Sequence, residues 1–332
     1  MVAWTLDKRD IRAFTILFVF FTTLVAIAAL FLSSRAAKGD RINRLVEDRS
    51  CIKCDLDNIT LRDADLKQAD LEDASLRNTD LTASNFSRAN LSDAVLSGSV
   101  LSDVDLSLAN LQDAVFSGAV LEGSKLIEAD LRGAYLGDAV LDKAVLTDAI
   151  LEDAILIRTQ LQDAYLSNAN FRRADLGEAN LQSSVLRRAK FVRSNLGNAD
   201  LYKANLQRAD LRRADLRRAN LGNATLRHAN LRDANLGQAN LSGADLTKAN
   251  LIDAFLRESD LTNANLQDAD LTGAGLARVN FQGANLTGIT LNEANLRRAN
   301  LTDATVDRSA LGEAKLCETT LPNGFVSDRD CP

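Results

Sequence analysis

Four cysteines and one histidine are the residues of this sequence best suited to chemistry near neutral pH. Cys51 and Cys54 form a C-x-x-C pair, while Cys317 and Cys331 lie near the C-terminus. C-x-x-C is typical of thiol redox centres, and four cysteine sulfurs are also a ligand set for structural zinc. Because His228 is the only histidine, there are few groups for acid–base catalysis. No P-loop, dinucleotide glycine pattern or H-E-x-x-H motif is present. We therefore expect no catalytic residue, no metal and no cofactor.

The composition indicates small, repeated packing units. Hydrophobic residues make up 46% of the chain and aromatic residues 5%, and the chain has only 2 prolines that could separate secondary-structure elements. A core built on large aromatic side chains is therefore not expected. The net charge of −6 gives no general attraction to nucleic acid.

An uncharged apolar segment covers residues 13–32 and follows a short tail, residues 1–12. Twenty helical residues span about 30 Å, the thickness of a bilayer core. The sequence therefore predicts one transmembrane helix over 13–32, followed by a linker and entry segment over 33–50. The alternative is a cleavable signal peptide ending near Ser34, but the apolar stretch is longer than such segments usually are. Basic residues flank both ends of the span, so the positive-inside rule does not give its orientation.

From Leu56 to Leu321 every fifth residue is Leu, Phe or Val. Ala usually stands two residues earlier and Asp or Asn one residue earlier, as in Ala204-Asn205-Leu206. A period of five puts the leucines on no single face of a helix and on alternating faces of a straight strand. They share one side if the chain turns by a fixed angle after each short extended piece. The pattern therefore predicts a solenoid.

This A-(D/N)-L-x-x pattern resembles the pentapeptide-repeat family over residues 51–321. The resemblance implies an all-β fold, a right-handed quadrilateral β-helix with four pentads per coil, with the central residue and the preceding Ala pointing inward. The 54 pentads would then form about 13.5 coils and, at ~4.8 Å per coil, a rod of roughly 65 Å.

The cysteine-containing ends resemble the entry and exit caps of cyanobacterial members of that family, with the exit cap at 322–332. The resemblance implies that Cys317 and Cys331 form a disulfide that fixes the exit loop, and that Cys51 and Cys54 belong to a structural cap rather than a redox site. Disulfides persist outside the reducing cytosol. We therefore expect the repeats to face the periplasm or the thylakoid lumen.

With four pentads per coil, residues twenty apart should stack on one face, so the sequence predicts which outward residues are neighbours. Apolar residues replace the usual Asp or Asn in three ladders on neighbouring faces: Val95, Val115, Tyr135 and Ile155; Val100, Val120 and Val140; and Val145, Tyr165 and Val185. Two interpretations stay open. Such residues favour extended backbone, and contiguous exposed apolar area also marks interfaces.

Charge is segregated along the chain. Residues 56–155 carry 19 acidic and 7 basic residues, whereas residues 156–235 carry 7 acidic and 15 basic ones. The basic zone stacks on two neighbouring faces: Arg172, Arg173, Arg193, Arg212 and Arg213 on one, and Arg187, Arg188, Arg208 and Arg227 on the other. It is interpreted either as a solvated surface or as a contact for anionic lipid. Nucleic acid is disfavoured because no aromatic residues interleave for base stacking.

The function that we expect is a non-catalytic, membrane-tethered scaffold that binds a protein partner. One alternative comes from the family resemblance, because some pentapeptide-repeat proteins mimic B-form DNA and bind type II topoisomerases. The membrane segment, the cysteine caps and the arginine band all argue against that role. Another alternative is an envelope component that assists transport or lipid deposition.

Overall fold

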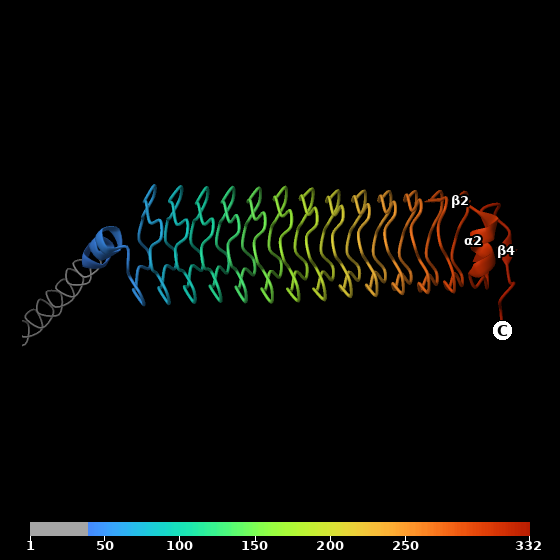
Figure 1. The fold of residues 1–332 in the computed structure, drawn as a ribbon, viewed down its shortest axis with the longest axis horizontal. Helices are drawn as coiled ribbons and strands as arrows, with labels where there is room; N and C mark the ends of the chain where they lie inside the picture. Colours follow the sequence, from blue (N-terminus) through green and yellow to red (C-terminus); the bar gives the residue numbers. More distant parts are fainter. Residues whose placement is uncertain (1–38) are drawn as a thin grey trace, which may run out of the picture.

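The computed structural model describes residues 39–332, which form a straight rod of stacked coils (Figure 1). Helical residues 39–48 lead into the first coil, and Leu45 of this helix is buried. The predicted transmembrane segment, residues 13–32, lies outside the described residues. Among residues 39–332, no helix combines the length and apolar character needed to cross a membrane.

Parallel β-bridges join residues twenty apart along the rod, such as Asn205 and Thr225. Each coil therefore contains twenty residues. Four pentads therefore form four faces. We call them face A, with Leu56 and every twentieth residue after it, and faces B, C and D, which begin at Leu61, Leu66 and Leu71. The two turn residues after each central residue form the corners. The D–A corner, for example, carries Glu72 and Asp73.

The pentad is shaped by its hydrogen bonds. In Ala204–Arg208, the amides of Asn205, Leu206 and Arg208 bond to carbonyls of the adjacent coils at 2.7–2.9 Å, and Ala209 closes the turn onto the Leu206 carbonyl at 2.9 Å. The amide of Gln207 donates to the side-chain Oδ1 of Asn205 at 3.2 Å. The side chain of Asn205 thus accepts from the one amide of the pentad that makes no bond to an adjacent coil or within the turn. This explains why the pentad has Asp or Asn at this position.

The second turn residue of every pentad from Lys53 to Asp303 has a positive φ, for example 60° at Arg208. This left-handed conformation turns the chain at each corner, as in a type II turn. Glycine occurs at only some of these positions; Asp and Asn, which tolerate this conformation, fill many of the others, and Arg, Lys, Glu and Gln, which rarely adopt it, fill most of the rest.

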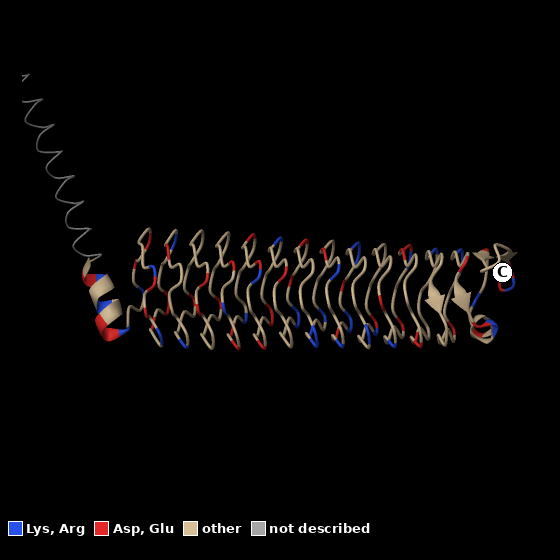
Figure 2. Cartoon of the chain, turned by 90° about the horizontal axis from the view of Figure 1, so that it is seen from above, with Lys and Arg blue, Asp and Glu red and all other residues tan. Residues whose placement is uncertain are grey.

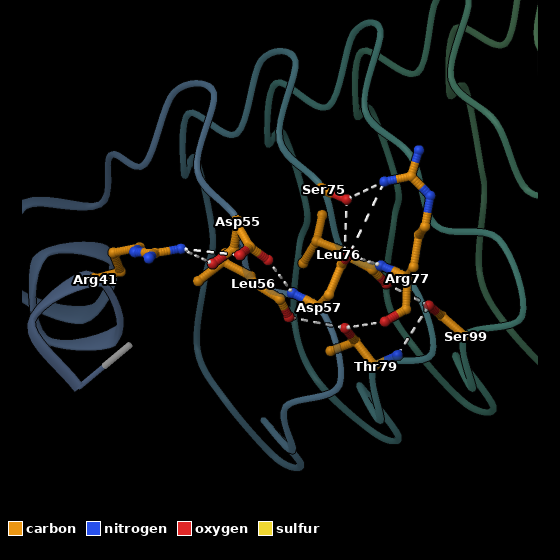
Figure 3. A network of polar contacts seen from close by, with 9 residues as sticks. All are labelled: Arg41, Asp55, Leu56, Asp57, Ser75, Leu76, Arg77, Thr79 and Ser99. Atoms are coloured by element: carbon orange, nitrogen blue, oxygen red, sulfur yellow. Dashed lines mark hydrogen bonds and ion pairs between the residues drawn. The ribbon is translucent and has the colours of Figure 1, made fainter. Parts of the chain in front are cut away.

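The core is a ladder of leucines lined by alanine. Leu206 and Ala204 are each 0% exposed. Phe171 and Phe191 stack inside face D with ring centroids 4.9 Å apart. Where Ser or Thr replaces Ala, most of the buried hydroxyls donate to a backbone carbonyl, either of the coil before, as from Thr159 to Leu136, or of the same coil, as from Ser184 to Leu181. In Figure 3, Thr79 donates to the Leu56 carbonyl and Ser99 donates to the Leu76 carbonyl.

The rod ends in short regular elements. The strands β1 (Asn285–Leu286) and β2 (Thr305–Val306) pair in parallel, and β3 (Thr319–Thr320) and β4 (Val326–Ser327) pair antiparallel. Between them α2 (Arg308–Glu313) replaces one pentad. The periodicity predicts Leu311 in the inner ladder, but α2 leaves it only partly buried. Ser309 and Ala310 stand at the inner and Asx positions of this pentad, but Ser99 and Val100 depart from the pattern in the same way and keep the pentad form.

Both cysteine pairs are bonded. Cys51 and Cys54 form one disulfide and Cys317 and Cys331 form another, with Cα–Cα distances of 5.3 and 4.7 Å. The second links the last coil to the segment after β4. There Leu316 and Asp330 also exchange hydrogen bonds at 2.7 Å. At the other end, Arg41 of the entry helix pairs with Asp55 at 3.4 Å (Figure 3).

Candidate interaction surface

The rod interior is filled by side chains, so the candidate sites lie on its outside. No group of His, Cys, Asp or Glu in residues 39–332 is arranged to hold a metal ion. Two depressions on the described surface are open grooves. One of about 690 Å³ runs along face A and its A–B corner, and one of about 450 Å³ lies at the D–A corner.

The three apolar ladders stack in the register that the twenty-residue spacing predicts. Val95, Val115, Tyr135 and Ile155 are bridged in sequence on face A. The ladders starting at Val100 and Val145 follow in the same way on faces B and C. Tyr135 is 39% exposed and Tyr165 is 52% exposed. The structure therefore presents three partly exposed apolar columns side by side on neighbouring faces; their use as an interface stays a prediction.

These ladders cost the backbone a hydrogen bond at each step. Val115 and Tyr135 occupy the position that Asn205 has in its own pentad. Asn205 accepts a hydrogen bond from the amide two residues later, but the side chains of Val115 and Tyr135 have no acceptor for that amide. Within the described residues, the amides of Ser117 and Gly137 accordingly make no hydrogen bond. An unmade bond to a backbone amide is unfavourable. The apolar residues therefore do not serve the turn, which favours a role in contacts over a purely structural one.

The groove on face A begins where the apolar ladder ends. Ile157 stands at its start, and Gly177, Gly197 and Gly237 lie along it, with Arg217 and Arg257 further on. Glycine at these positions leaves space beside the Asx side chains of the face. The sequence reading missed this groove, although the glycines recur at twenty-residue steps before Arg217 and after it.

The predicted basic residues are brought together at two corners. Arg172, Arg193, Arg212 and Arg213 line the groove at the D–A corner, joined by Arg232. Arg173 lies beside them and pairs with Asp153, while Arg213 pairs with Asp233 at 3.4 Å. The hydrogen bond from Arg173 holds the pKa of the Asp153 carboxyl below its usual value. In Figure 2 the Lys and Arg colour is most frequent in the middle of the rod.

The second group lies at the C–D corner. Arg227 pairs with Asp245 at 3.8 Å. Arg187, Arg188 and Arg208 make no ion pair or hydrogen bond through their side chains in the described part of the chain. Face D is thus bordered by arginines on both sides between residues 172 and 232.

Several exposed apolar residues lie outside the ladders and were not singled out from the sequence. Among them, Phe255 on face A is 59% exposed. The sequence could have indicated this residue, because Phe255 replaces the Asp or Asn expected one residue before a central leucine.

Comparisons with known proteins match this geometry. The model of pentapeptide repeats matches residues 50–82 and 159–312 in overlapping segments, and a second model, of a pentapeptide repeat region, matches 69–146. No curated protein matches the sequence. The chain is similar to HetL, a pentapeptide repeat protein involved in heterocyst differentiation regulation in the cyanobacterium Nostoc sp. strain PCC 7120. That match has 34% identity over 66% of this chain and 91% of HetL, with a TM-score of 0.52.

Two further solved structures are more distant. Rfr23, a pentapeptide repeat protein from the cyanobacterium Cyanothece 51142, is 29% identical over 36% of this chain and 92% of its own, with a TM-score of 0.30. QnrB1, a plasmid-mediated fluoroquinolone resistance protein, is 18% identical over 73% and 91%, with a TM-score of 0.24.

Proposed function

The chain belongs to the pentapeptide-repeat family, whose fold is a right-handed β-helix, and we propose that it is a non-catalytic protein-interaction scaffold tethered to a membrane by residues 13–32. Members of this family are generally structural or interaction proteins. The observation that carries the proposal is the set of apolar ladders, which expose Val, Tyr and Ile at positions where the fold itself favours Asp or Asn.

Two further features support an interaction role. Contiguous exposed apolar area is typical of protein interfaces, and the ladders occupy three neighbouring faces over the same coils. The grooves on the described surface are open and polar, whereas enzyme sites are usually concave pockets with a few converging polar groups. HetL, the similar protein, is named for a regulatory role.

The proposed location outside the cytosol is supported by the two disulfides, which persist in oxidising compartments. The uncharged stretch at residues 13–32 supplies the proposed anchor. The arginine-bordered face D is a surface that anionic headgroups would also fit.

The interaction is tested with a tagged full-length chain, cross-linked in expressing cells, and mass spectrometry of what it captures. Changing Val115, Tyr135 and Ile155 to Asp should abolish capture. The control changes Asn205, Asn230 and Asn250 to Asp. It adds the same charge and retains the oxygen that accepts from the turn amide. Equal capture by both variants would remove the ladder from the interface.

Topology is tested by alkylating intact cells with a membrane-impermeant maleimide, with and without prior reduction. The chain should stay in the membrane fraction, and its cysteines should react only after reduction. A chain found in the soluble fraction with free thiols would overturn the tether and reopen the cytosolic, topoisomerase-regulating alternative.

A further inference from the structure

The D–A corner carries a sorted column of charges. Its second turn residues are Lys53, then Asp73, Asp93 and Asp113, then Gly133 and Asp153, then Arg173, Arg193 and Arg213, and then Asp233. Because residues twenty apart are bridged, these side chains stand in one line along the rod. An acidic block is thus followed by a basic block of similar length.

The column is complementary to itself when reversed. If two copies lie antiparallel with residues opposite each other whose numbers add up to 286, then Asp73 faces Arg213, Asp93 faces Arg193, Asp113 faces Arg173 and Lys53 faces Asp233. Every charged pair in this register is of opposite sign. The neighbouring column of first turn residues agrees, since Glu72 faces Arg212 and Arg132 faces Glu152.

Other registers lose this match. Sliding one copy by one coil in one direction sets Asp113 against Asp153 and Lys53 against Arg213. Sliding it the other way sets Asp73 against Asp233 and two copies of Asp153 against each other. Like charges face each other in both cases, which is costly at an interface. Among these three registers, the charges of the D–A corner therefore favour the one in which the numbers add up to 286.

Three of the side chains that this register pairs have no partner in their own chain, whereas Lys53 and Asp73 already pair with each other at 3.6 Å. Asp93, Asp113 and Arg193 are exposed and make no side-chain hydrogen bond or ion pair within residues 39–332. Arg173 and Arg213, by contrast, already pair with Asp153 and Asp233 in their own chain. The Asp93–Arg193 contact would be made twice, once on each side of the two-fold axis.

Face A, which adjoins this corner, fits the same arrangement. In an antiparallel face-to-face packing the D–A corner of one copy meets the D–A corner of the other. Near the two-fold axis, Tyr135 of one copy then meets Ile155 of the second. Val115 and Val95 come to lie opposite Asp175 and Asn195, the two face A residues that line the groove. The apolar contact in this register is therefore centred on Tyr135 and Ile155 near the two-fold axis.

We propose that a second copy of this chain is the partner of face A, in an antiparallel homodimer whose two-fold axis passes midway between Gly133 and Asp153 of the D–A corner. The contact from Lys53 to Asp233 extends over nine coils, about 43 Å at ~4.8 Å per coil. This inference deepens the proposed function and rests on it, because it names the partner of the face A ladder.

The test uses two differently tagged full-length copies, co-expressed and co-purified in mild detergent. The variants are Asp93→Arg and Arg193→Glu. Each alone places like charges opposite each other twice and should weaken self-association at least tenfold. Co-expressing the two variants with each other should restore co-purification, because both contacts in the mixed pair are again of opposite sign.

The matched control makes the same charge changes on the diagonally opposite corner. Asp103→Arg and Lys203→Glu lie ten residues, half a coil, beyond the test positions, and they should leave self-association unchanged. All four positions have the same left-handed turn conformation, and Arg, Lys, Asp and Glu all occur there in the native chain. Melting temperatures of the variants, followed by circular dichroism, check that each one folds.

Restored association in the mixed pair, together with weaker binding at 1 M than at 0.1 M salt, supports the dimer, because screening shortens from about 10 to 3 Å. A wild-type chain that does not self-associate, or one whose association ignores the D–A variants, overturns it. Neither result affects the interaction scaffold if cross-linking still captures another protein through the ladder. Loss of both readouts would remove the proposed function as well.

Discussion

The amide of Gln207 donates a hydrogen bond to the side chain of Asn205 at 3.2 Å, and this contact within one pentad explains why the repeat contains Asp or Asn. Equivalent bonds recur along the rod, as from Gly197 to Asn195 at 3.0 Å. The motif is thus set by a backbone amide that neither the turn nor the adjacent coils can satisfy.

Removing this side-chain acceptor should destabilise the rod. Asn205→Ala leaves the Gln207 amide without its partner and should lower the free energy of unfolding by about 0.5–1.5 kcal/mol. Asn205→Asp keeps an accepting oxygen and should stay close to wild type. Urea denaturation of both variants measures the difference; equal loss in both would mean that the bond contributes little.

A substitution that gives the Ser117 amide a hydrogen-bond acceptor on face A should affect self-association but not the stability of the fold. Val115→Asn gains a bond to the Ser117 amide and loses a half-buried valine, so the free energy of unfolding should stay within about 1 kcal/mol of wild type. Self-association should nevertheless fall, because the ladder loses an apolar side chain. If stability drops sharply and association does not change, Val115 has a structural role.

The inner ladder should not tolerate charge. Leu206 is 0% exposed, and Leu206→Asp loses the burial of a leucine and places a carboxylate in the core. We expect a loss of more than about 3 kcal/mol and a lower melting temperature. The control Arg208→Asp changes an exposed corner two residues away, where Asp is common, and should melt like the wild type. Unchanged melting of Leu206→Asp would contradict the inward assignment.

Two buried serines offer a matched comparison. Ser99 accepts from the Thr79 amide at 3.1 Å and donates to the Leu76 carbonyl. The hydroxyl of Ser124 is buried without a hydrogen-bond partner in the described structure. Ser99→Ala should therefore cost about 1 kcal/mol, while Ser124→Ala should be neutral or stabilising by a similar amount. Chemical denaturation gives both values, and a stabilising Ser99→Ala would contradict the network of Figure 3.

Acid should weaken the rod through its Asp–Arg pairs. The hydrogen bond from Arg217 holds the pKa of the Asp215 carboxyl below its ordinary value of 3.8. A carboxyl with a depressed folded-state pKa contributes its stability above the unfolded-state pKa, and the contribution is lost as pH falls through the folded-state value. The stability advantage of wild type over Asp215→Asn should therefore be present at pH 7 and disappear well below pH ~4.

The Asn variant isolates the ion pair, because its side-chain oxygen can still accept from the Arg217 amide as Asp215 does at 3.1 Å. Unfolding midpoints measured across this pH range provide the test. An advantage that grows on acidification would have the wrong sign. A small effect at pH 7 is expected, since Arg217 is exposed and surface pairs are weak.

Much of this architecture was predictable because the repeat is so regular. The five-residue period and the Ala–Leu spacing predict the inner ladder, and stacking at twenty residues predicts which ladder residues are bridged, as for Val115 and Tyr135. At corners with long side chains the turn conformation was not predictable from residue type. Arg208 has a φ of 60°, yet arginine has no preference for the left-handed region.

The ends of the rod depart from the pattern in ways that the spacing does not indicate. Leu311 keeps the five-residue spacing but lies in α2, whereas Leu101, whose pentad also lacks the inner Ala and the Asx side chain, stays in the inner ladder. The helix at residues 39–48 had no periodic signal, since a single buried residue, Leu45, covers the first coil. The partner choices of the corner arginines depend on side-chain rotamers that sequence spacing does not determine.

The twenty-residue coil also limits how the length of this protein can change. Although α2 replaces a pentad, Lys315 is still bridged to Asn295, twenty residues earlier. Deleting five residues anywhere would rotate every following side chain onto the next face and scatter the columns on both sides of the cut. Deleting twenty would shorten the rod by one coil and keep each column in line. Insertions and deletions that preserve the surface therefore come in whole coils.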